Sequence, residues 1–222
     1  MNFEFFMQTK LFYGICKDEV QKLLDCMGAY TKKYEKGEVI YHVGEVINNI
    51  GMPLCGSVII ENDDLWGNKS ILNRIEPGHI FGETYACIEG EPMMVNAVAD
   101  DKTEVLFFNI EKIFHVCKNS CRYHNMIIKN LLWISAHKNL QLSRRILHTS
   151  AKSIRGRLMS YFSECVKQTG SRIIAIPFNR QQLADYLSVD RSAMCSELSK
   201  MKKDGLLEYN KNIFHLIENG EI

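Results

Sequence analysis

Side chains that could bind a partner through hydrogen bonds occur close together in the stretch 176–198. Arg191, Ser192 and Ser196 fall on the outer face of a predicted helix whose other face is apolar. An arginine can donate two hydrogen bonds to the edge of a guanine, and a serine hydroxyl can bond to several bases. These residue types predict recognition of a DNA major groove, whereas an ordinary helical hairpin is the structural alternative.

Two short helices joined by a tight turn position these side chains. Asn179 is a good cap for the first helix, and Gln182 stands where a capping-box partner would stand. Ser188 and Val189 form the turn, and Asp190 can cap the second helix. This arrangement is typical of a helix-turn-helix that enters a major groove.

The residues after this motif predict a β-hairpin. Lys202 to Gly205 ends the second helix, and the two β-prone runs 206–209 and 213–217 are separated by the turn 210–212. A further β-prone run, 172–176, precedes the motif. A helix-turn-helix followed by such a hairpin, or wing, is far more specific than the two helices alone.

Composition and charge agree with this interpretation. The chain has 222 residues, 46% apolar and 24% charged, as expected for one large or two small globular domains. Residues 144–222 hold 13 Lys/Arg against 8 Asp/Glu, a balance of +5, whereas residues 1–143 have a balance of −4. A basic C-terminal part fits a nucleic-acid partner, although the excess is modest.

The first half of the chain predicts a helix over 9–29 and then a small β structure. Glycines punctuate short β-prone segments between residues 30 and 109, which indicates an antiparallel sandwich or barrel. The segments are 39–41, 57–60, 70–72, 95–98 and 104–108. A short helix over 84–88 follows Gly82 and Glu83, a pair that could present backbone N–H groups to a small ligand or form a plain β-turn.

Residues 111–148 contain neither Gly nor Pro and predict a long helix. Its sequence is apolar almost all round between residues 126 and 136, so more than one face must be covered. A second copy of the chain could cover one face, or a single large core could enclose the helix. The residues predicted for a dimer helix are Ile127, Ile128, Leu131, Ile134 and Leu142.

Eight cysteines have neither a secretory leader before them nor CxxC spacing among them. No apolar run is long enough to cross a bilayer, so we expect reduced thiols in the cytoplasm, mostly acting as small apolar fillers. Cys117 and Cys121 lie four residues apart with His124 nearby. They could form a thiol switch or a metal or haem site, or be plain buried thiols. No metal and no cofactor is predicted.

The sequence resembles the Crp–Fnr superfamily of bacterial transcription regulators over nearly its whole length. The motifs that carry this resemblance are Gly37-Glu38, Gly44, Gly56-Ser57-Val58, Pro77-Gly78, Phe81-Gly82-Glu83, Arg155-Gly156-Arg157-Leu158, residues 179–187, Asp190-Arg191-Ser192 and residues 203–207.

This resemblance implies an α+β fold in three parts. An N-terminal antiparallel β-roll for effector sensing would occupy residues 1–110, a long dimerisation helix residues 111–148, and a C-terminal winged helix-turn-helix residues 149–222. The family acts as homodimers on palindromic DNA operators. A hinge near residues 149–153 would couple effector to DNA, and RNA polymerase would be a further partner.

Site residues follow from the same resemblance. The base-reading candidates are Arg191, Ser192 and Ser196, and the phosphate-contacting candidates are Lys152, Arg180, Gln181 and Lys211. Well-studied members carry an acid at the place of Ser192 and an arginine at that of Ser196, so the operator should differ from theirs.

The predicted effector pocket comprises Gly82, Glu83, Met93, Met94, Leu142 and Ser143. Members that bind cyclic AMP have an Arg-Ser pair where Met93 and Met94 stand, and the arginine neutralises the cyclic phosphate. Burying a phosphate without a cation is costly, so we expect a small molecule other than cyclic AMP. A vestigial pocket is the alternative.

Two other function classes compete with a DNA-binding regulator. A cyclic-nucleotide-binding-like or redox sensor could use the winged helix to regulate a protein partner. An enzyme is the weakest alternative, because the sequence contains no recognisable triad, Walker loop or zinc motif.

Overall fold

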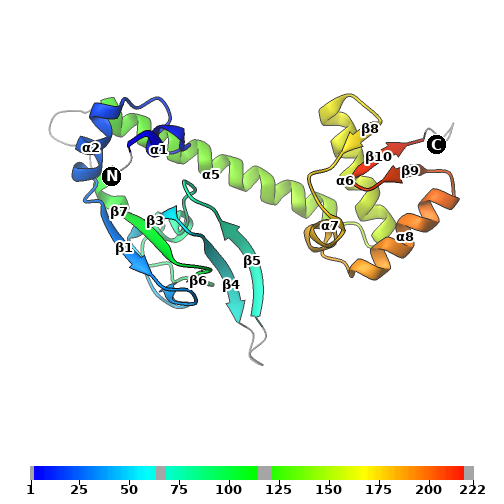
Figure 1. Ribbon diagram of the computed structural model, residues 1–222, viewed down its shortest axis with the longest axis horizontal. Coiled ribbons are helices and arrows are strands. Elements are labelled where there is room, and N and C mark those ends of the chain that lie inside the picture. Colours follow the sequence, from blue (N-terminus) through cyan, green and yellow to red (C-terminus); the bar gives the residue numbers. More distant parts are fainter. Residues whose placement is uncertain (1–2, 64–68, 115–121, 218–222) are drawn as a thin grey trace. The chain divides into compact units, whose positions relative to one another are not determined.

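Two units, Met1–Ala136 and His137–Ile222, make up the computed structural model (Figure 1). Residues 3–63, 69–114 and 122–217 are described. Strands and short helices form the first unit, and a helical domain with a small sheet forms most of the second. Each unit has its own hydrophobic core.

Antiparallel strands in the first unit pair in the orders β1-β7-β3 and β2-β6-β4-β5. Their bounds are β1 Tyr30–Tyr34, β2 Val39–Tyr41, β3 Asn49–Cys55, β4 Val58–Asp63, β5 Lys69–Ile75, β6 Asn96–Ala99 and β7 Thr103–Asn109. The consecutive residues 105–108 of β7 are all buried, so this strand is covered on both faces. The predicted small β structure is confirmed.

Strands β1 and β3 were not expected from the sequence. The residues of β1 are largely exposed and polar, and β3 contains Gly51 and Pro53, which are rare in strands. Both strands pair with β7 from far along the chain. Long-range pairing with a strongly apolar strand outweighs their weak local preference.

Short helices accompany the strands: α1 Phe3–Gln8, α2 Lys17–Cys26, α3 Glu83–Ala86 and α4 Ile110–Phe114. The predicted helix over 9–29 is therefore wrong in its first third. Irregular backbone with Gly14 at φ +79° separates α1 from α2. Such a positive φ ends helical geometry and suits glycine.

Helix α5 (Arg122–Thr149) buries one stripe within its own chain. Ile127 is fully buried and Leu131 is 4% exposed, both in the core of the first unit. Ile128 and Ile134 pack partly against the same core. Placing Ile127 and Leu131 on a dimer face is therefore wrong, because their own chain already covers them. Leu142, by contrast, is 60% exposed.

The second unit contains the predicted helix-turn-helix and wing. Its elements are α6 Ile154–Thr169, β8 Ile173–Ala175, α7 Arg180–Leu187, α8 Arg191–Lys203, β9 Leu207–Asn210 and β10 Ile213–Leu216. The sheet has the order β8-β10-β9 (Figure 1). Leu183, Met194 and Phe214 are fully buried in the core that these elements share.

The last turns of α5 belong to this second unit. Arg145 donates from Nε to the Tyr186 carbonyl oxygen at 3.1 Å and from Nη2 to that of Asp185 at 2.9 Å. His148 Nδ1 lies 2.9 Å from the Tyr186 hydroxyl. The boundary expected between residues 148 and 149 thus lies inside the unit. Ser153 caps α6 by accepting from the Gly156 amide, and the proposed hinge at 149–153 stays a prediction.

Candidate nucleic-acid interface

Helix α7 begins with a complete capping box. The Asn179 side chain accepts from the Gln182 amide at 2.9 Å, and the Gln182 side chain accepts from the Asn179 amide at 2.9 Å. At its other end Ser188 adopts a left-handed conformation with φ 53°. That reversal ends α7 and turns the chain toward α8.

Asp190 caps the start of α8. Its Oδ1 accepts from the Ala193 amide at 2.8 Å and from the Ser192 hydroxyl at 2.5 Å. These two bonds, the hydroxyl first, hold the pKa of Asp190 below its usual range. The cap is therefore an ionised carboxylate at neutral pH.

The register of α8 is fixed by its buried residues. Met194 and Met201 are fully buried and Leu198 is 1% exposed, so this face packs on the unit's core. Arg191, Ser192 and Ser196 consequently lie on the exposed side. The predicted orientation of the base-reading candidates is confirmed, although contact with a base stays a prediction.

Arg180 is held by the aromatic residues of the wing. Its guanidinium carbon lies 4.8 Å from the centre of the Phe214 ring and 4.9 Å from that of Tyr209. A guanidinium against such rings gains from their electron-rich faces. The side chain is therefore positioned before any ligand arrives.

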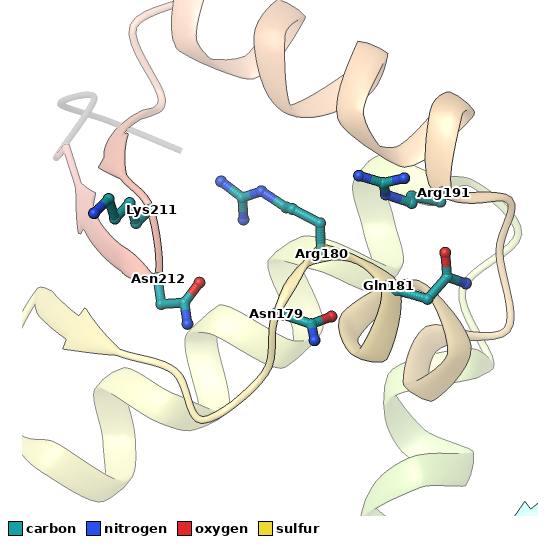
Figure 2. Close-up of a pocket in the computed structure, with 6 residues that line it drawn as sticks. All are labelled: Asn179, Arg180, Gln181, Arg191, Lys211 and Asn212. Carbon is teal, nitrogen blue, oxygen red and sulfur yellow. The ribbon is translucent and has the colours of Figure 1, made fainter.

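A concave surface of about 620 Å³ lies between the helix-turn-helix and the wing. It is lined by Asn179, Arg180, Gln181, Arg191, Lys211 and Asn212. Figure 2 shows the Arg180 side chain between the wing, which carries Lys211, and the start of α8, which carries Arg191. We call this surface the basic groove.

The basic groove unites four of the predicted DNA-contacting residues, Arg180, Gln181, Arg191 and Lys211. Three of the six lining residues are cationic, three are amides and none is acidic. Such a lining suits phosphate oxygens and base edges. Lys152, Ser192 and Ser196 are exposed but do not line the groove.

Asn179 and Asn212 line the groove and were not predicted as contacts. The sequence predicts only a capping role for Asn179. Asn212 is part of the Asn-Lys-Asn turn, whose three polar residues were the available signal. Lys211 in that turn has φ 51°, a region where Gly or Asn is favoured.

Two arginines of α6 bind the helix-turn-helix through ion pairs and hydrogen bonds. Arg155 forms ion pairs with Glu197 at 2.6 Å and Asp204 at 2.7 Å, at the middle and the end of α8. Arg157 donates to the carbonyl oxygens of Leu187 at 3.0 Å and Ser188 at 2.8 Å. Helix α6 therefore braces both the turn and α8. Spacing alone did not reveal these roles.

The cysteines depart from expectation. Cys16, Cys26, Cys55 and Cys87 are exposed, so the prediction of apolar fillers is wrong for them. Cys16, Cys26 and Cys87 lie at the ends of helices and Cys55 at the end of β3, where the thiols are uncovered. The possible redox pair, residues 117 and 121, lies outside the described residues. Within residues 3–63, 69–114 and 122–217, no three His, Cys, Asp or Glu side chains are grouped as a metal site.

Two family models match the chain: a cyclic nucleotide-binding domain over residues 31–120 and a Crp-like helix-turn-helix domain over residues 156–218. The cyclic AMP receptor protein of Thermus thermophilus is 30% identical over 98 residues, which cover 44% of this chain. They also cover 44% of that protein, so the match spans less than half of this curated relative.

The chain combines a cyclic nucleotide-binding domain with a Crp-like helix-turn-helix domain, which supports a regulator of the Crp–Fnr family. Solved structures agree on the fold. CprK in complex with OCPA has a TM-score of 0.58 at 18% identity, covering 91% of this chain and 94% of that one. The c-di-GMP-responsive global regulator CLP of Xanthomonas campestris has a TM-score of 0.54 at 16% identity, covering 92% and 100%.

The residues predicted for the Crp–Fnr effector pocket differ in their surroundings. Gly82 has φ +79° and caps α3, whose first residue, Glu83, is 5% exposed. Met93 is 3% exposed in the core of the first unit, whereas Met94 is 68% exposed. The two methionines therefore do not share one environment.

The remaining predicted pocket residues, Leu142 and Ser143, are exposed and lie in the second unit. Their contribution to an effector site stays a prediction. None of the helices in the described residues combines the length and apolarity needed to span a membrane.

Proposed function

We propose that the chain is an effector-responsive, sequence-specific DNA-binding regulator of transcription that acts as a homodimer on a palindromic operator. The basic groove carries this proposal. It brings two guanidinium groups and an ammonium group together with three amides beside the exposed start of α8. Cations supply affinity for phosphates, and α8 offers Arg191 to base edges.

A homodimer is supported by the uncovered face of α5. Leu132 and Ile146 are both 68% exposed, and Leu142 and Leu147 are both 60% exposed. Exposed apolar surface of this extent on one helix favours burial against another protein. A second copy is the occupant that a palindromic operator requires, because two-fold symmetry in DNA mirrors two-fold symmetry in protein.

The effector is proposed to be a small molecule other than cyclic AMP. No arginine occurs between Arg74 and Arg122, so the sequence around Met93 supplies no guanidinium for a cyclic phosphate. Met93 itself is enclosed by apolar neighbours. We further propose a cytoplasmic protein that acts on RNA polymerase.

DNA binding is tested by the fluorescence anisotropy of labelled duplexes over a range of salt concentrations. Binding by the full chain should weaken steeply with salt, with a slope of about −0.9 for each phosphate neutralised. Arg191→Ala should weaken binding while leaving the thermal unfolding midpoint unchanged, since this side chain is exposed.

Lys167→Ala is the matched control. Lys167 is an exposed cation of α6 that does not line the basic groove. If it weakened binding as much as Arg191→Ala, the groove would not be the interface. Salt-insensitive binding, or none, would favour a sensor that regulates a protein partner.

The effector proposal has its own test in calorimetric titration with cyclic AMP. No saturable heat is expected up to a concentration of about 1 mM. Micromolar binding would refute the argument from Met93 and Met94. If cyclic AMP does not bind, mass spectrometry of small molecules that copurify with the native protein would identify the effector.

A further inference from the structure

Ser192 is the one base-reading candidate whose hydroxyl hydrogen already has a fixed acceptor. Its Oγ donates to Asp190 Oδ1 at 2.5 Å. The acceptor also receives the Ala193 amide, so the carboxylate is held in place from its own helix. Hydrogen bonds to a charged acceptor are about twice as strong as neutral ones.

This commitment changes what the serine can offer a ligand. A hydroxyl has a single hydrogen and two lone pairs. With the hydrogen directed at Asp190, the exposed oxygen presents only lone pairs outward. A serine that is usually able to donate or accept is thereby restricted to accepting.

Ser196, the other base-reading serine of α8, is not restricted in this way. Ser196 has no hydrogen-bond partner among the residues that the structure describes, so its hydroxyl can rotate toward a donor or an acceptor. Ser199 also has its hydrogen committed, to the carbonyl oxygen of Cys195 within its own helix, but it is not a base-reading candidate. Ser199 lies two turns further along α8 than Ser192.

In the major groove only adenine and cytosine present amino donors, at N6 and N4, whereas guanine and thymine present acceptors at the corresponding edges. We propose that Asp190, by holding the hydroxyl hydrogen of Ser192, leaves this serine able only to accept a hydrogen bond from DNA. Ser192 would then select a base with an amino group, adenine or cytosine, at one position of each operator half-site. This inference rests on the proposed DNA-binding function and adds the chemical class of base that the position takes.

Selection of bound duplexes from a random-sequence library tests the inference with the full-length chain. The wild type should enrich adenine or cytosine over guanine and thymine at one position of each half-site. Ser192→Ala should reduce that preference by about tenfold in competition binding. Ser196→Ala is the matched control and should leave the preference at this position unchanged.

Asp190→Gly separates orientation from contact. Glycine is tolerated as a helix cap, and the change removes the acceptor of the Ser192 hydroxyl. The discrimination between amino and keto bases should flatten at that position, while the rest of the selected sequence persists. Thermal unfolding confirms that the variant is folded.

Two results would overturn the inference. The first is an amino-base preference that survives in Ser192→Ala; if it is then lost in Asp190→Gly, the carboxylate itself reads the base. The second is an amino-base preference that survives in Asp190→Gly. If the wild type enriches no sequence at all, the proposed function fails instead, and this outcome is distinct from either of those.

Discussion

The two units differ in whether their important residues are buried or exposed. In the first unit, Ile127 and Met93 are buried, and the effector-site candidate Glu83 is 5% exposed. In the second, Arg191 and Lys211 are exposed and line the basic groove. Substitution in the first unit should therefore act mainly on stability, and substitution in the groove mainly on binding.

The largest expected effect is on stability, and it separates two isoleucines of helix α5. Ile127→Ala should lower the free energy of unfolding by roughly 2–5 kcal/mol, because a fully buried side chain leaves a cavity. Ile146→Ala, at a 68% exposed position, should change it by less than about 0.5 kcal/mol in the monomer. Urea unfolding at low protein concentration measures both. Equal losses of unfolding free energy in the two variants would contradict the assignment of one buried and one exposed face to α5.

A reciprocal pair of substitutions sharpens the comparison within the second unit. Lys211→Gly should leave stability unchanged or raise it by up to about 1 kcal/mol, because glycine adopts the left-handed conformation without strain. It should also reduce the salt slope of DNA binding by about 1 per subunit.

Lys167→Gly should behave in the opposite way. This exposed position lies in the last turn of α6, where glycine costs up to about 1 kcal/mol relative to good helix formers. DNA affinity should be retained, since Lys167 does not line the groove. Chemical unfolding measures the stability of both variants, and fluorescence anisotropy measures their DNA binding. If both variants changed stability and DNA affinity in the same way, Lys211 would have neither the strained backbone nor the phosphate contact assigned to it.

The smallest expected effect concerns a buried histidine of the second unit. Burial lowers the pKa of His148 from its usual value near 6.5, Glu164 opposes this shift and Arg144 adds to it. Tyr186 and Tyr161 lie against its ring. Its Nε2 has no hydrogen-bond partner among the described residues.

The sign of the pH effect follows from that shift. The unfolded chain takes up a proton at His148 below about pH 6.5, before the folded chain does. The second unit should therefore lose stability as pH falls from about 6.5 toward the lowered pKa. His148→Phe should reduce this slope, and pH-dependent urea unfolding measures it. An unchanged slope in His148→Phe would refute the assignment.

The sequence predicted the second unit well because its determinants are local. The Asn179 and Gln182 capping box, the turn at Ser188 and the period of Met194 and Leu198 all act within a few residues. Helical period alone then leaves Arg191 exposed. Asn212 was missed as a groove residue because its place there depends on the wing folding back toward α7.

The first unit was harder to predict because its determinants are distant. Strand β1 has little strand character of its own and exists through pairing with β7. The buried stripe of α5 was assigned to a dimer because the sequence shows that Ile127 must be covered but not by what. Met93 and Met94 are adjacent in sequence, yet only the fold determines that one is buried and the other exposed.

Guanine methylation interference on a selected duplex tests the central claim most directly, namely that a homodimer reads DNA through the start of α8. For the wild type we expect guanines whose methylated N7 blocks binding in two symmetric half-sites, about one helical turn, or 34 Å, apart. Arg191→Ala should lose this interference at the guanine that the arginine contacts. Interference that is absent, confined to a single unpaired site, or unchanged in Arg191→Ala would contradict the account.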